Sequence, residues 1–191
     1  MNEKINYGLK IYTDFTEKEI KENTLIFNID NKEHKEIREE NFENNFISHT
    51  IINLNVEGAS VEFIGRYKAN KSLCDVSCII NHNANNTKSK INIRGIAEIE
   101  GKIISRSNII VPENIKGIEG EEKVKFIFVI DENGKGGEID AIPNLDISSH
   151  DVRVSHAMSI SKIKKADIFY AGLHSLSEKE SEKLFEESFL N

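Results

Sequence analysis

The sequence predicts a mainly β domain that ends in two short helices. Residues 46–160 form a series of short segments with the period of a strand, and glycines separate many of them. In the segment at 50–57, Ile52, Leu54 and Val56 alternate with polar residues, which is the pattern of a strand buried on one face. Such a series of strands is typical of a sandwich, a barrel or a stacked β-solenoid. Periodicity leaves these three open, because no repeat of fixed length stands out.

The segments on either side of this β region differ from it in composition. Residues 7–15 and 24–30 have the composition of short strands, whereas residues 31–45 are highly charged and contain few apolar anchors. We expect 31–45 to form a solvent-exposed loop or a short surface helix. The predicted parts are 1–45, with strands and a charged loop that lead into the core, a β core at 46–162 and a helical part at 163–191.

The C-terminal part carries two helical signals. Ser177 is a predicted N-cap, and Glu180 completes a capping box at the start of the second helix. Residues 166–174 predict a shorter helix before it. The apolar side chains are Ile168, Phe169 and Leu173 in the first helix and Leu184, Phe185 and Phe189 in the second. We expect them to cover the end of the β core, or to leave part of this apolar stripe for a partner.

Composition and charge exclude several classes of protein. The formal net charge is −7, with 32 Asp and Glu against 25 Lys and Arg, so a general attraction to nucleic acid or anionic lipid is not expected. The longest apolar run, 126–130, is far shorter than the roughly 18 residues of a membrane span. Because residues 1–15 contain no apolar region of a signal peptide, we expect a soluble, cytoplasmic protein.

The two cysteines, Cys74 and Cys78, fall in a predicted strand at 73–80. Residues four apart on a strand are separated by about 13 Å, whereas disulfide partners need Cα atoms within about 7 Å. We therefore expect both to be free, buried thiols of the core.

The residues themselves indicate no reaction. Ser155 and His156 are neighbours on a predicted strand and so point to opposite faces, which prevents one from activating the other. The glycine-rich stretch at 134–137 lacks the spacing of a phosphate-binding loop. His150 and His156 share strand parity but lie about 20 Å apart on a straight strand, too far for one metal ion. We expect a protein that is not an enzyme.

Several motifs occur in a recognisable order. A polar turn of the form NH-x-A-x-x-T-x-S is followed by a G-x-A-x-x-x-G-K-I segment, then by PNLDI, SHAMSISKI, DIFY and LSEKE. The first two consist of Asn81, His82, Ala84, Thr87 and Ser89, and of Gly95, Ala97, Gly101, Lys102 and Ile103. In this order the stretch from 46 to 190 resembles the core of SufB and SufD, the scaffold proteins of the SUF iron-sulfur assembly system. The match corresponds to a minimal form without the N-terminal helical region of full-size members.

The resemblance implies a fold, a function and partners. It implies a right-handed parallel β-helix with a C-terminal helical subdomain, acting as a non-enzymatic platform for iron-sulfur cluster assembly with a SufC-type ABC ATPase. It also implies pairing with a SufB/SufD-type scaffold, or with itself as a homodimer. The helical part would be the docking surface for the ATPase, with contacts from Ile168, Phe169, Tyr170, Leu173, Leu184 and Phe185.

His156 corresponds in this resemblance to a histidine of the D-type scaffold that faces the interface between two scaffold chains. It is thereby a candidate ligand for iron or for a transient iron-sulfur cluster at that interface, and no tightly bound cofactor is expected. The chain departs from the B-type pattern, since Ala157 replaces an acidic residue and residues 136–140 contain no cysteine. Val154 replaces a cysteine of some D-type chains. The chain therefore resembles a D-type platform more than a B-type chain that holds the cluster.

Two other functions are compatible with the pattern. A degenerate homologue would only dimerise or sequester partners, which the missing cysteine and acidic residue leave open. A β-solenoid enzyme acting on carbohydrate would need aromatic platforms, but aromatic residues make up 7% of the chain and tryptophan is absent from its sequence.

Overall fold

The computed structural model describes residues 20–42, 45–171 and 176–191, which form ten strands and two helices. The strands are β1 (Ile20–Ile29), β2 (His34–Asn41), β3 (Asn45–Leu54), β4 (Ser60–Ala69), β5 (Leu73–His82), β6 (Lys88–Ala97), β7 (Lys102–Val111), β8 (Ile118–Ile130), β9 (Glu138–Ile147) and β10 (Val152–Lys164). The helices are α1 (Lys165–Ala171) and α2 (Glu178–Leu190).

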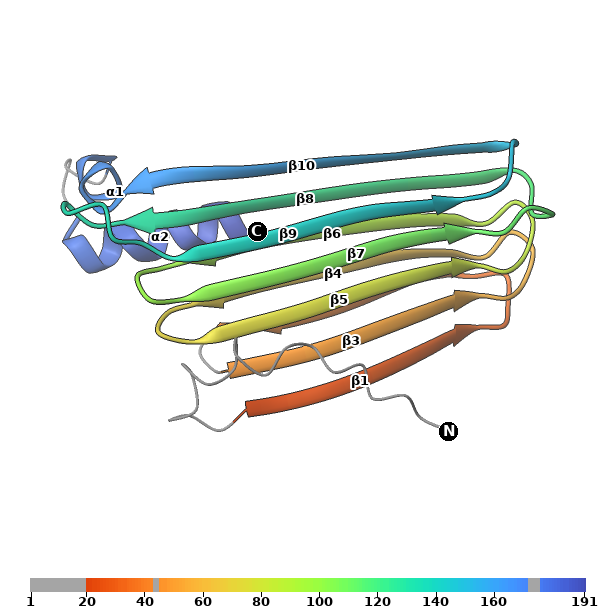
Figure 1. Cartoon of the computed structure of the whole chain (residues 1–191), viewed down its shortest axis with the longest axis horizontal. Coiled ribbons are helices and arrows are strands. Elements are labelled where there is room, and N and C mark those ends of the chain that lie inside the picture. The colour runs from red at the N-terminus through yellow and green to blue at the C-terminus, as the bar shows by residue number, and fades with distance from the viewer. Residues whose placement is uncertain (1–19, 43–44, 172–175) are drawn as a thin grey trace.

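Consecutive strands alternate between two sheets, and every pairing within a sheet is parallel. The sheets have the orders β1-β3-β5-β7-β9 and β10-β8-β6-β4-β2. In Figure 1 the odd strands lie in front and run to the right, the even strands lie behind and run to the left, and the chain rises with each coil. This is the right-handed sense of parallel crossovers. The structure confirms the parallel β-helix and excludes the sandwich and the barrel.

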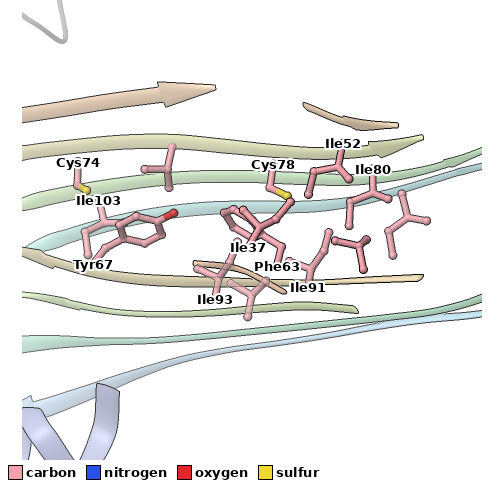
Figure 2. Packing of buried hydrophobic residues seen from close by; sticks show 14 of the residues in the cluster. Ile37, Ile52, Phe63, Tyr67, Cys74, Cys78, Ile80, Ile91, Ile93 and Ile103 are labelled. Atoms are coloured by element: carbon pink, nitrogen blue, oxygen red, sulfur yellow. The ribbon is translucent and has the colours of Figure 1, made fainter. Parts of the chain in front are cut away.

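The core lies between the two sheets and consists of columns of apolar side chains. Ile37, Phe63 and Ile91 are register partners on β2, β4 and β6, and face Ile52 and Ile80 of the other sheet (Figure 2). Each coil thus covers the apolar side chains of the coil before it, and burial of that surface stabilises the stack.

Asparagine side chains form ladders between successive coils. Asn81 donates to Asn53 at 2.8 Å, 28 residues earlier, and Asn53 donates to Asn28 at 2.9 Å, 25 residues earlier. In the last coil Asn144 donates to Asn108, 36 residues earlier. The coil length therefore varies, which is why no repeat of fixed length is visible in the sequence.

The polar turn predicted by the family motif joins β5 to β6 around a buried histidine. His82 Nδ1 lies 2.7 Å from the Thr87 hydroxyl, and its Nε2 lies 2.9 Å from the Ser89 hydroxyl. Because the Thr87 hydroxyl donates to the Ala84 carbonyl, it accepts from Nδ1, and Nε2 accepts from Ser89. Burial lowers the pKa of His82 to about 4, so the folded protein keeps this ring neutral at pH 7.

The charged segment at 31–45 is a correction to the sequence analysis, because it contains strand β2 rather than a loop or a helix. Only Ile37 and Glu39 of this strand are buried, and pairing with β4 holds it in place. The Glu39 carboxylate accepts from Tyr67 at 2.5 Å, from Ser48 at 2.6 Å and from Thr50 at 3.2 Å. The strand expected at 24–30 lies in β1, and the strand expected at 7–15 falls outside the described residues.

Other local predictions are confirmed. Cys74 and Cys78 are buried and free, and burial raises the pKa of both thiols. Ser177 caps α2 in a capping box with Glu180, whose carboxylate accepts from the Ser177 amide at 2.8 Å. Within the described residues, neither helix is long and apolar enough to cross a membrane.

We expect the substitution His82→Gln to change how stability depends on pH. Wild type loses stability as pH falls from about 6.5 to about 4, because the unfolded chain binds a proton on His82 that the folded protein excludes. As pH falls across that range, wild type should therefore lose about 3 kcal/mol more of its free energy of unfolding than the variant loses. Urea denaturation at several pH values measures it, and a difference independent of pH would contradict a buried neutral ring.

Candidate functional site

The predicted metal ligand His156 lies on β10, the edge strand of the second sheet. It is the register partner of Glu122 on β8. Register partners of a parallel sheet point to the same face from strands about 4.8 Å apart. Val154, which has the same parity, packs against the core, so this face of β10 looks into the solenoid. His156 is nevertheless exposed, because within the described residues no further coil covers this edge.

Glu122, which the sequence analysis missed, is the register neighbour of His156 in the interior. Its side chain is fully buried, its Oε1 accepts from the Ser107 hydroxyl of the opposite sheet, and its Oε2 has no hydrogen-bond partner. Burial raises the pKa of Glu122, and the Ser107 hydrogen bond and the nearby His156 offset part of that rise. Glu122 shares the inward parity of Val124 and Phe126, so the alternation of β8 could have identified it.

The edge around His156 exposes large apolar side chains. Met158 and Ile160, which share the inward parity of His156, are 47% and 40% exposed. Ile142 on β9, the edge strand of the first sheet, is 52% exposed. We call strands β9 and β10 with these side chains the open end. Apolar side chains on an unpaired edge are typical of a surface that pairs with another chain.

A metal bound at the open end would need ligands from outside this chain. Among the described residues, no group of three or more His, Cys, Asp or Glu is placed to hold a metal ion. His150 lies in the connection between β9 and β10 rather than on the strand. His156 therefore offers an incomplete site, which suits a position between two chains.

The two helices, α1 and α2, which we call the helical pair, present the second predicted surface. Phe169, Tyr170 and Leu184 are 41%, 68% and 56% exposed. Ile168 is only 5% exposed and packs with Ile96 and Val129 of the solenoid. Ile168 therefore packs α1 against the solenoid and does not offer an exposed contact.

The remaining predicted contacts of the helical pair differ in position. Phe185 is partly buried against the cluster around Ile168. Leu173 falls outside the described residues. The exposed part of the predicted docking surface is thus formed by Phe169 and Tyr170 on α1 and Leu184 on α2.

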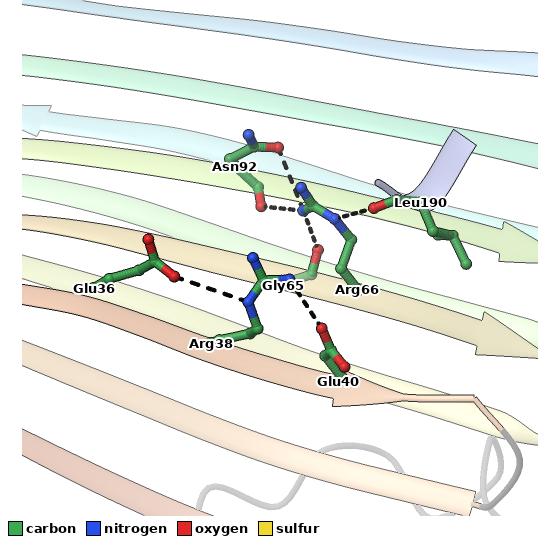
Figure 3. A network of polar contacts seen from close by, with 7 residues as sticks. All are labelled: Glu36, Arg38, Glu40, Gly65, Arg66, Asn92 and Leu190. Carbon is green, nitrogen blue, oxygen red and sulfur yellow. Dashed lines mark hydrogen bonds and ion pairs between the residues drawn. The ribbon is translucent and has the colours of Figure 1, made fainter. Parts of the chain in front are cut away.

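Basic side chains of the second sheet fix the end of α2 to the solenoid. Arg66 Nε donates to the Leu190 carbonyl (Figure 3). Arg94 donates to the Phe189 carbonyl at 2.8 Å. Lys68 pairs with Glu186 at 2.5 Å. Cations at the last turn satisfy carbonyls that the helix itself leaves free and oppose its dipole. These three contacts hold the C-terminal half of α2 against the second sheet.

A cavity of about 390 Å³ separates the helical pair from the turns that follow β4 and β6. Ile96, Val129, Ile168 and Phe185 contribute its apolar lining. The charged side chains around it are Lys71, Glu98, Glu100, Lys165, Glu182 and Glu186. The four glutamates among them are each paired with a lysine of this chain: Glu98 and Glu186 with Lys68, Glu100 with Lys135, and Glu182 with Lys165.

We expect Glu122→Gln to stabilise the protein at neutral pH. Burial raises the pKa of Glu122 in the folded state. The stability that Glu122 contributes is therefore fully present below the ordinary glutamate pKa of about 4.3, and it is lost as pH rises through the folded-state pKa. The neutral amide should therefore raise the unfolding free energy at pH 7.5 and give little gain at pH 4. Glu39→Gln is the matched control and should lower stability, because the Glu39 carboxylate accepts three hydrogen bonds. Urea denaturation measures both, and a less stable Glu122→Gln at pH 7.5 would refute the account.

Comparison with known proteins places this fold in a family. The family described as "SUF system FeS cluster assembly, SufBD core domain" matches residues 31–189. No match was found among the curated proteins. The matched range contains the open end with His156 and Glu122, as well as the exposed residues of the helical pair. The chain belongs to the SufB/SufD family of iron-sulfur cluster assembly proteins.

Proposed function

We propose that this chain is a non-enzymatic platform for building an iron-sulfur cluster, in complex with a SufC-type ABC ATPase. Membership of the family gives it a role in iron-sulfur cluster assembly. The observation that carries the finer proposal is the exposed apolar surface of the helical pair, Phe169, Tyr170 and Leu184, on helices anchored to the solenoid. In this proposal the platform meets its ATPase in the cytoplasm.

The helical pair is the docking surface for the ATPase in this proposal. Aromatic side chains dominate binding energy at interfaces when a partner buries them, and Phe169 and Tyr170 are 41% and 68% exposed. Because Ile168 is held by Ile96 and Val129, α1 needs little reordering on binding.

The open end is the surface for a second scaffold, which is either another copy of this chain or a related SufB/SufD-type chain. Pairing would bury Met158, Ile160 and the edge of β10. The cluster is cargo at this interface. A neutral imidazole from His156 would ligate iron there, and thiolates or carboxylates of the partner would complete the site.

We expect the double substitution Phe169→Ala and Tyr170→Ala to weaken the complex with the SufC-type ATPase at least tenfold. Loss of two exposed aromatic contacts removes the anchors of the interface. Co-purification and titration calorimetry measure the complex. Ile26→Ala is the control, since Ile26 is 60% exposed and lies on β1, away from the helical pair. Equal binding by wild type and double variant would overturn the docking assignment.

Charge at the open end should disrupt pairing of scaffold chains. We expect Met158→Lys with Ile160→Lys to shift a self-association equilibrium at least tenfold towards monomer, because lysines at an edge oppose strand addition. Ile26→Lys on β1 serves as the control, because Ile26 is 60% exposed at the opposite end of the solenoid. Sedimentation equilibrium gives the constants. If Ile26→Lys dissociates the protein and the double variant does not, pairing uses the other end.

A further inference from the structure

Among the described residues, two buried glutamates, Glu39 and Glu122, point into the solenoid, and they differ in how their carboxylate oxygens are hydrogen-bonded. Both oxygens of Glu39 accept hydrogen bonds, from Tyr67 on one and from Ser48 and Thr50 on the other. Glu122 receives one hydrogen bond, from Ser107, and its Oε2 has none although the side chain is fully buried. A buried carboxylate oxygen without a partner costs free energy, so its persistence indicates a further ligand.

The position of Glu122 identifies where that ligand would lie. Glu122 and His156 are register partners on adjacent parallel strands and point to the same face from about 4.8 Å apart. Glu122 is held on its other side by Ser107, while His156 lies at the uncovered edge. Glu122 thus lies between Ser107 of the opposite sheet and the strand that carries His156 at the uncovered edge.

We propose that Glu122 and His156 together bind one divalent transition metal ion such as Fe²⁺ at the open end. Bonds from a metal ion to ligands of these types are about 2.0–2.2 Å long. Side chains on strands about 4.8 Å apart can therefore both reach one ion that lies between them. Imidazole and carboxylate are both suitable ligands for iron, and two protein ligands leave coordination positions open for cargo or for a partner's side chains. This deepens the proposed function, on which it rests, by adding to His156 a carboxylate from inside the solenoid.

A bound metal ion would also stabilise the negative charge of the Glu122 carboxylate. Burial disfavours the ionised carboxylate, as the direction of its pKa shows, and a bound cation would reverse that preference.

Anaerobic titration with Co²⁺ alone tests the site, because its visible absorption reports tetrahedral or five-coordinate ligation. We expect wild type to bind Co²⁺, and Glu122→Gln and His156→Ala each to weaken binding at least tenfold. Glu39→Gln, which changes the other interior carboxylate, should bind like wild type. In the wild-type protein, Co²⁺ should also broaden the ring-proton NMR signals of His156 and spare those of buried His82, a readout that needs no variant to fold.

The outcomes separate this site from the wider proposal. Wild-type affinity in Glu122→Gln, with loss only in His156→Ala, would remove Glu122 from the site. Absence of Co²⁺ binding by wild type, or unchanged His156 signals, would overturn the site altogether. Either result would leave complex formation with the ATPase intact, whereas failure of that complex would overturn the proposed function and leave the metal titration unchanged.

Discussion

Parallel stacking of coils is the constraint on which this structure depends. Each coil of a solenoid can bury its apolar side chains only against its neighbours, so the ends of the stack remain incomplete. At one end β9 and β10 leave His156, Met158 and Ile160 exposed although these side chains point towards the interior face. The same stacking that builds the core therefore leaves an exposed apolar edge on which a second chain could pack.

The helical pair covers apolar side chains that the stacked coils leave on their outer face. Ile168, Phe185 and Phe189 cover apolar side chains on the outside of the solenoid, next to Ile96 and Val129. Arg66 and Arg94 hold the last turn of α2, so the helices are fixed while Phe169 and Tyr170 stay exposed. The two candidate surfaces thus lie on different parts of the solenoid, the open end on β9 and β10 and the helical pair against β4, β6 and β8.

The fold could be predicted from the sequence where alternation was strong. Strand β3 buries every second residue, and its period is visible as Ile52, Leu54 and the residues between them. The architecture required the family motifs, because coils that differ in length, with asparagine ladders 25, 28 and 36 residues apart, hide the repeat. Strand β2 was missed because pairing with β4, rather than its own apolar content, places it in the sheet.

The candidate site was predictable only in part. The motif pointed to His156, and the resemblance pointed to Tyr170, which is 68% exposed. The burial of Ile168 and the link between His156 and Glu122 depend on contacts across strands far apart in the chain. Local patterns do not report such contacts, although the parity of Glu122 with Val124 gave a usable signal.

Anaerobic reconstitution with iron and sulfide, in the presence of the SufC-type ATPase, tests the central claim most directly. The account predicts visible charge-transfer absorption of an iron-sulfur cluster with the wild-type chain and its loss with His156→Ala. Cluster formation at the same yield with His156→Ala would contradict the assignment of the open end as the place of assembly.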